Sequence, residues 1–148
     1  MKRSTRLAAA LTSLLLMVGF ASPAMSQNDP DMLTILTSGH DETQAMALIL
    51  TMQAMDNQVD AQILLCDEAG DLAVGELAGD SPVFEGPDAS PAQMVQRLIG
   101  NGVTVEVCAI YLPNREYTDA DLIDGVGIAQ PPAIGALVAD PGVRLFTF

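Results

Sequence analysis

The sequence predicts a single doubly wound α/β domain built on a parallel sheet. Apolar runs of four to six residues recur along the chain without regular polar alternation, as in strands that are buried on both faces. Segments with helical spacing or with helix-start signals separate these runs, which is typical of βαβ units. The chain has 148 residues, enough for one domain with its own core and too few for two.

The first strand is expected at residues 32–37, an apolar run with β-branched residues that ends at a Ser-Gly pair. A helix is expected over residues 42–58, and Asp41 or Ser38 can cap its start. Met46 and Leu50 widen its apolar stripe, so we expect burial over more than one narrow face. The stripe itself consists of Ala45, Leu48, Ile49, Met52 and Met55.

The middle of the chain predicts two further strands, at residues 61–66 and 103–108. Between them, residues 67–77 have room for one or two helical turns, and residues 79–90 are a loop rich in proline, glycine and acids. A helix over residues 90–102 has Ser at the cap, Pro at the first position and an Asn-Gly ending.

The last third of the chain completes the α/β alternation. Residues 109–117 are expected to form a loop, and residues 118–125 a short helix capped by threonine. A brief strand at residues 126–129, a helix over residues 131–138 and a closing strand at residues 143–148 follow. The predicted sheet therefore has five strands and is covered by helices on both faces.

Residues 1–26 have the three parts of a secretory signal. Lys2, Arg3 and Arg6 precede an apolar run over residues 7–20, and small residues precede a cleavage site before Gln27, with cleavage after Ala24 as a second option. A membrane anchor is the alternative, but the run is shorter than the roughly 20 residues that a spanning helix needs. We expect cleavage, a periplasmic or secreted location, and no membrane association of the mature domain, residues 27–148.

The mature domain is strongly acidic. It retains three arginines against all 19 acidic residues, a formal net charge of −16. Aromatic residues make up 4% of the chain and Trp is absent, so neither phosphate binding nor base stacking is expected and nucleic acid is excluded as a partner. Two cysteines are too few for a disulfide scaffold, a four-cysteine zinc site or an iron–sulfur cluster.

Other ligand motifs are weak. The acidic groups at residues 67–71 and 119–124 do not follow the spacing of a calcium loop. The pair Gly125 and Gly127 lacks the remaining glycine of a dinucleotide fingerprint. We therefore expect no cofactor.

Three chemically notable residues are expected at the carboxyl ends of strands, the edge where open parallel sheets bind ligands. His40 follows the first strand, Cys66 ends the second and Cys108 ends the third. Cys108 is either a small buried hydrophobic residue or an exposed thiolate nucleophile and sulfur carrier. A second interpretation makes the three residues a soft-metal (copper or zinc) or small-ligand site without turnover.

The segment GVTVEVCAIYLPNREYTDADLIDGVGIA resembles the DsrE/DsrF/TusD-like (DsrE-like) sulfur-relay family. The resemblance extends over residues 32–148 through SGHDETQAMAL, ILLCDEAGDLAV and the closing VRLFTF. It implies a flavodoxin-like three-layer sandwich with a five-stranded parallel sheet, assembled as a homotrimer or homohexamer. It also implies that Cys108 carries a persulfide. Two departures stand out: Tyr111 replaces the second cysteine of the C-x-x-C seen in some members, and we expect this chain to be an exported variant.

Our leading hypothesis is a periplasmic DsrE-like protein that binds or transfers sulfane sulfur through Cys108. His40 is expected to support the thiolate, and Tyr111 and Asn114 to line the pocket. The sulfur donor and acceptor are unknown, and the residues leave open whether the chain is a sulfurtransferase enzyme or a carrier. The resemblance assigns no role to Cys66.

A geometric argument suggests a role for Cys66. Neighbouring strands lie about 4.8 Å apart, and a disulfide needs Cα atoms roughly 4.4–6.8 Å apart. If the second and third strands are neighbours, Cys66 and Cys108 meet this condition, unless the pleat sends their side chains to opposite faces. We predict that Cys66 acts as a resolving partner that cycles Cys108 between thiol and disulfide in an oxidising compartment.

Overall fold

The computed structural model describes residues 29–79 and 81–148, so the expected export signal lies outside the described residues. The elements alternate between strands and helices along the whole described chain. They are β1 (Met32–Leu36), α1 (Asp41–Asp56), β2 (Ala61–Leu65), η1 (Asp67–Ala73), α2 (Pro91–Gly100), β3 (Thr104–Val107), α3 (Tyr111–Asn114), η2 (Asp119–Asp121), β4 (Val126–Ile128), α4 (Pro131–Ala139) and β5 (Arg144–Thr147).

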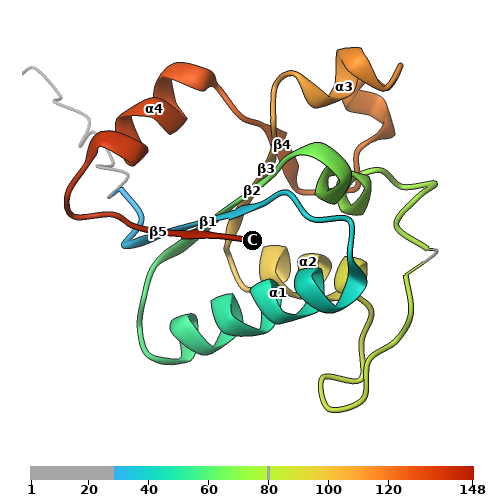
Figure 1. The fold of residues 1–148 in the computed structure, drawn as a ribbon, viewed down its shortest axis with the longest axis horizontal. Helices are drawn as coiled ribbons and strands as arrows, with labels where there is room; N and C mark the ends of the chain where they lie inside the picture. The colour runs from blue at the N-terminus through green and yellow to red at the C-terminus, as the bar shows by residue number, and fades with distance from the viewer. Residues whose placement is uncertain (1–28, 80) are drawn as a thin grey trace, which may run out of the picture.

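The five strands form one parallel sheet in the order β4-β3-β2-β1-β5. Helices α1 and α2 lie on one face and α4 lies on the other, which makes three layers (Figure 1). This arrangement confirms the predicted α/β sandwich with a five-stranded parallel sheet. All five strands lie where the apolar runs place them.

The main core lies between the sheet and helices α1 and α2. On β2 and β3, alternate residues point into it: Ile63 and Leu65 from one strand, Val105 and Val107 from the other, each at most 1% exposed. From α2, Leu98 is fully buried against them. The side chains of these strands therefore alternate between the two faces of the sheet. The sequence does not show this alternation, because both faces carry apolar residues.

The opposite face is covered much less completely than we expected. Its buried cluster consists of Leu33, Leu64, Ala129, Leu137 and Val143. Leu137 is the only buried residue of α4, and β5 is exposed along its whole length. One helix of nine residues, rich in alanine, is too short and too slender to cover a five-stranded face.

Helix α1 differs from its predicted packing. Met46 and Leu50 are 51% and 47% exposed, so the helix buries one narrow face only. The polar residue Thr51 is buried in their place, because its hydroxyl donates to the carbonyl of Ala47 and lies 3.0 Å from the hydroxyl of Thr34 on β1. Apolar spacing alone does not reveal that a buried strand threonine offers α1 a polar partner.

The start of α1 is also different from the prediction. His40 occupies the N-cap position, and no side chain caps the helix. The hydroxyl of Ser38 instead accepts a hydrogen bond from the backbone N–H of His40, and the side-chain amide of Gln44 donates to the carbonyl of Ser38. The loop after β1 is therefore held by its own polar contacts rather than by a capping side chain.

The segment after β3 is not entirely a loop. Residues 111–114 form the short helix α3, which is stabilised because the side-chain amide of Asn114 donates to the carbonyl of Ile110 at 2.7 Å and Tyr111 is buried. The helix expected after Thr118 is only the three-residue turn η2. Within the described part of the chain, no helix is long and apolar enough to span a membrane.

Candidate functional site

The two cysteines lie side by side at the carboxyl edge of the sheet. The register pairs Leu65 of β2 with Val107 of β3, so the next residues, Cys66 and Cys108, stand opposite one another. The N–H of Cys108 donates to the carbonyl of Leu65 at 2.8 Å, which continues the ladder to this point. Both cysteines are half-buried.

The pleat sends both sulfur atoms to the same side. Side chains alternate along a strand, so Cys66 shares the face of Leu64, and Cys108 shares the face of Glu106. These two rows face α4: Leu64 belongs to the cluster under that helix, and both cysteines pack against the same cluster. The opposite-face arrangement, which would have prevented bonding, is therefore not the one found.

Cys66 and Cys108 are joined in a disulfide, with their Cα atoms 5.1 Å apart. This distance lies inside the range that a disulfide requires. The geometric condition for a resolving role of Cys66 is thus met. The bond links the start of η1 to the residue three positions before α3, so it ties together the two segments that leave the sheet at this edge.

The same two segments are tied by polar contacts further along. Tyr111 is buried, and its hydroxyl donates to Oδ1 of Asp71 at 2.6 Å. Gly70 allows this approach, because a Cβ at that position would overlap the Tyr111 ring. Burial, together with the hydrogen bond to Asp71, raises the pKa of Tyr111 well above its usual value of 10.0. Tyr111, the first residue of α3, therefore packs against η1 and does not line an open pocket.

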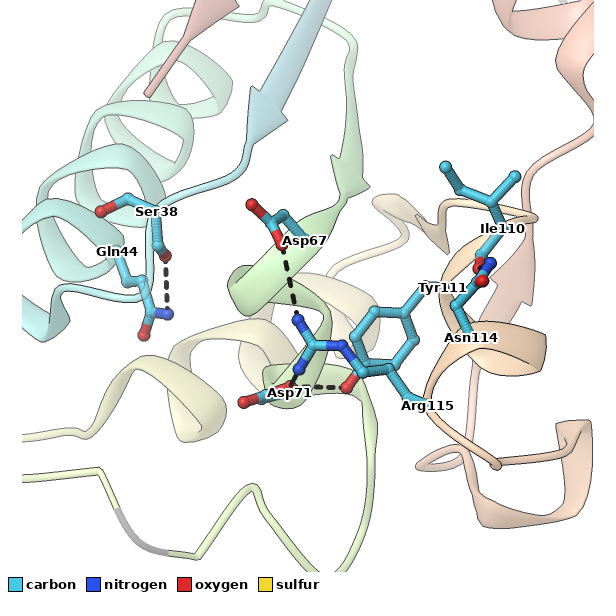
Figure 2. A network of polar contacts seen from close by, with 8 residues as sticks. All are labelled: Ser38, Gln44, Asp67, Asp71, Ile110, Tyr111, Asn114 and Arg115. Carbon is cyan, nitrogen blue, oxygen red and sulfur yellow. Dashed lines mark hydrogen bonds and ion pairs between the residues drawn. The ribbon is translucent and has the colours of Figure 1, made fainter.

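Arg115 completes this network. Its guanidinium lies 3.4 Å from Oδ1 of Asp67 and 3.6 Å from Oδ1 of Asp71, and it stacks over the Tyr111 ring at 5.4 Å (Figure 2). Asp67 directly follows Cys66 and has the left-handed backbone φ of 50°, which aspartate tolerates better than most residues. Through Asp67, this network begins at the residue that follows Cys66.

Sequence reasoning did not assign Asp67, Asp71 or Arg115 to the site. One signal was present: Arg115 is one of three arginines between residues 27 and 148, isolated among acids on the loop after the Cys108 strand. Its partners precede it by 48 and 44 positions, so only the folded chain shows the pairing.

The other predicted site residues are placed differently. Asn114 is exposed, and its side-chain amide donates to the carbonyl of Ile110, the residue before α3 (Figure 2). His40 is exposed in the loop after β1, where its backbone makes the contacts described above. Among the hydrogen bonds of the described residues, none joins the His40 side chain to either cysteine.

The soft-metal interpretation is not supported. In residues 29–79 and 81–148, no group of three or more His, Cys, Asp or Glu side chains is arranged to hold a metal ion. Metals bind cysteines as thiolates, and both sulfur atoms are instead joined in the Cys66–Cys108 disulfide.

No protein-family model and no curated protein matches the sequence. Among solved structures, the fold is similar to the YchN protein of E. coli, with a TM-score of 0.63 and 21% identity over 79% of this chain and 98% of that chain. It is also similar to MTH1491, a protein of unknown function from Methanobacterium thermoautotrophicum, with a TM-score of 0.55 and 16% identity over 79% of this chain and 96% of that one. At these identities the likeness establishes the fold, a DsrE-like, flavodoxin-like α/β sandwich.

Proposed function

We propose that this protein binds and transfers sulfane sulfur as a persulfide on Cys108, with Cys66 as the resolving thiol. The observation that carries the proposal is the juxtaposition of the two cysteines, with Cα atoms 5.1 Å apart at the carboxyl edge of the sheet. A persulfide formed on either sulfur lies within reach of the other. The similarity of the fold to YchN is consistent with the family resemblance that suggested this chemistry. The location is part of the proposal: we propose that the mature domain is exported and acts in the periplasm or outside the cell.

The loading step starts from the reduced pair. The Cys108 thiolate attacks the outer sulfur of a donor persulfide, R–S–SH, forming Cys108–S–SH and releasing the donor as its thiolate. An acceptor thiolate then attacks the same outer sulfur, which regenerates the Cys108 thiolate and leaves a persulfide on the acceptor. This sequence transfers one neutral sulfur atom and needs no external oxidant or reductant.

Cys66 provides a second outcome. Its thiolate attacks the inner sulfur of the Cys108 persulfide, which forms the Cys66–Cys108 disulfide and expels hydrosulfide. The two cysteines lose two electrons and the sulfane sulfur gains them. A thiol reductant must then reopen the disulfide before the next cycle. The disulfide of the structure corresponds to the resolved, unloaded form.

Mass spectrometry of the full chain tests this proposal. The protein is reduced, freed of reductant and incubated with inorganic polysulfide; we expect an adduct of one sulfur atom, ~32 Da, on Cys108. Cys66→Ser should accumulate the adduct and release little sulfide, whereas the wild type should release sulfide and return to the disulfide. Cys108→Ser should carry no adduct on Cys66. Loading of Cys66 in preference to Cys108, or no loading at all, would reject the proposal.

We also propose that the chain assembles as a homotrimer or homohexamer. The observations behind this are the exposed edge strand β5 and its large apolar residues, since Leu145 and Phe146 are each 43% exposed. Phe146 also lines a cavity together with the exposed Leu50 of α1. Exposed apolar surface of this kind is typical of interfaces. Light scattering at micromolar protein should give at least three chain masses, and a monomer mass would reject the assembly.

A further inference from the structure

We infer that the surroundings of the Cys66–Cys108 pair select thiol partners and sulfur donors by charge, admitting cationic ones and repelling anionic ones. The inference deepens the proposed function, because it concerns the same two cysteines and names the class of molecule that reacts with them. Its basis is the distribution of charged side chains around the carboxyl edge of the sheet.

Acidic side chains follow two of the strands that end at this edge, β1 and β2. Asp67 is adjacent to Cys66 and its side chain is 73% exposed, while that of Asp71 is 42% exposed. Asp71 also lines a cavity of about 390 Å³ together with Glu68 from η1 and Asp41 from the start of α1. These four carboxylates come from segments that follow β1 and β2, so the field is built by the fold and not by one acidic run.

The positive charge at this edge is insufficient to neutralise them. Arg115 pairs with Asp67 and Asp71 and leaves a formal surplus of three negative charges among these five groups. The other arginines of the described chain lie elsewhere. Arg97 donates to the carbonyls of Pro87 and Asp88, and Arg144 begins β5 at the amino edge of the sheet.

The surplus of negative charge should affect the rate of thiol–disulfide exchange at the Cys66–Cys108 pair. A disulfide is opened by a thiolate, and a persulfide donor is itself anionic when its terminal sulfur is ionised. Each negative charge on the incoming molecule is repelled by the carboxylates, while an ammonium group on the same molecule offsets the repulsion. For three surplus charges in water-exposed surroundings, the rate should change by about tenfold per unit of charge at low ionic strength, and salt should screen the effect.

Thiols of different charge test the inference on the oxidised full-length protein. The probes are cysteamine, 2-mercaptoethanol and 2-mercaptoethanesulfonate, which differ by one unit of charge at each step. Rates of disulfide opening are expressed per thiolate and divided by the rates of the same thiols with a small neutral disulfide. We expect cysteamine to be fastest and the sulfonate slowest, each step about tenfold, with the spread falling to within about twofold in 1 M salt.

Two variants identify the carboxylates responsible. Asp67→Asn with Glu68→Gln should reduce the spread at low salt, and asparagine is compatible with the left-handed backbone of residue 67. Asp31→Asn with Asp60→Asn is the matched control: it removes two charges at the other end of β1 and β2, about 20 Å away, and should leave the spread unchanged.

Equal normalised rates for the three thiols in the wild type would overturn the inference, as would an Asp67→Asn/Glu68→Gln variant that behaves like the Asp31→Asn/Asp60→Asn control. The wild-type salt series stands even if a variant folds poorly. Because no sulfane sulfur enters this experiment, its result is independent of persulfide formation. A failure of the polysulfide test with charge selection intact would reject the proposed function alone.

Discussion

The two faces of the sheet differ in how many apolar residues are buried against them. Among the described residues, the cluster on the side of α1 and α2, which also includes residues of η1 and α3, has 20 buried members, and the cluster on the side of α4 has five. The same strands supply both, so the apolar character of the strands does not explain the difference. The helices do: α1 and α2 have 16 and 10 residues, whereas α4 has nine and buries only Leu137.

Because of this difference, one face holds the strands in place and the other leaves the two cysteines accessible. The well-packed face fixes the register of β2 against β3, because residues such as Ile63 and Val107 fit tightly under α2. That register places Cys66 and Cys108 on the thinner face, where both remain half-buried and reachable. At this edge a covalent bond and a polar network add to the apolar burial of η1 and α3.

The largest expected effect comes from breaking the covalent tie. Reduction of the disulfide should lower the free energy of unfolding by about 4 kcal/mol, since its loop closes over 42 positions of sequence. Urea unfolding of the oxidised and reduced protein measures this difference. The double variant Cys66→Ser/Cys108→Ser serves as the control and should unfold like the reduced wild type. Equal stability of the oxidised and reduced forms would contradict the comparison.

Neighbouring leucines on β2 test the two faces directly. Leu65 is 0% exposed on the well-packed face and Leu64 is 6% exposed under α4. We expect Leu65→Ala to cost about 3–4 kcal/mol and Leu64→Ala about 2 kcal/mol, because the thinner face can collapse around the missing atoms. Both are measured by urea unfolding of the oxidised protein. Equal losses would show that the two faces contribute alike.

A smaller effect tests the polar tie beside the disulfide. Tyr111→Phe removes the hydrogen bond to Asp71 and should lower the free energy of unfolding by about 1 kcal/mol at neutral pH. Since folding raises the pKa of Tyr111, the native hydroxyl stabilises the fold fully below pH 10, and the contribution is lost as the pH rises beyond it. The gap between wild type and variant should therefore narrow above pH 10.

Tyr117→Phe is the control for that experiment. Tyr117 donates to Oε1 of Glu76, and this hydrogen bond raises the pKa of Tyr117, but its side chain is less buried than that of Tyr111. Its substitution should cost less than that of Tyr111 under the same conditions. A larger loss for Tyr117→Phe would contradict the role of Tyr111 in holding α3 against η1.

Local patterns predicted the elements well where they are strong. Strands β1, β2 and β3 lie at apolar-rich runs because such runs are stable when buried, whereas the edge strands β4 and β5 are half-buried and exposed. The Ser90–Pro91 start of α2 was predicted because its signal is local, and Ser90 caps the helix as expected, with Gln93 completing a reciprocal cap. Helix α3 was missed because its stability depends on the burial of Tyr111 against η1.

The packing of α1 shows the limit of such patterns. Its apolar residues surround most of the helix, so spacing alone does not say which of them meet the sheet. The structure buries Thr51 and leaves Leu50 exposed, because Thr34 of β1 supplies a hydroxyl partner beneath the helix. A polar contact between two elements thus decided which face of α1 is inside.

By itself, the sequence determined the fold class, the order of the five strands and the position of both cysteines at strand ends, since each of these follows from residues a few positions apart. Only the tertiary structure decided that Cys66 and Cys108 share one face and one bond, and that Arg115 meets Asp67 and Asp71 beside them. Strand register and long-range ion pairs depend on side chains more than 40 positions apart, and only the packing of the whole core brings them together.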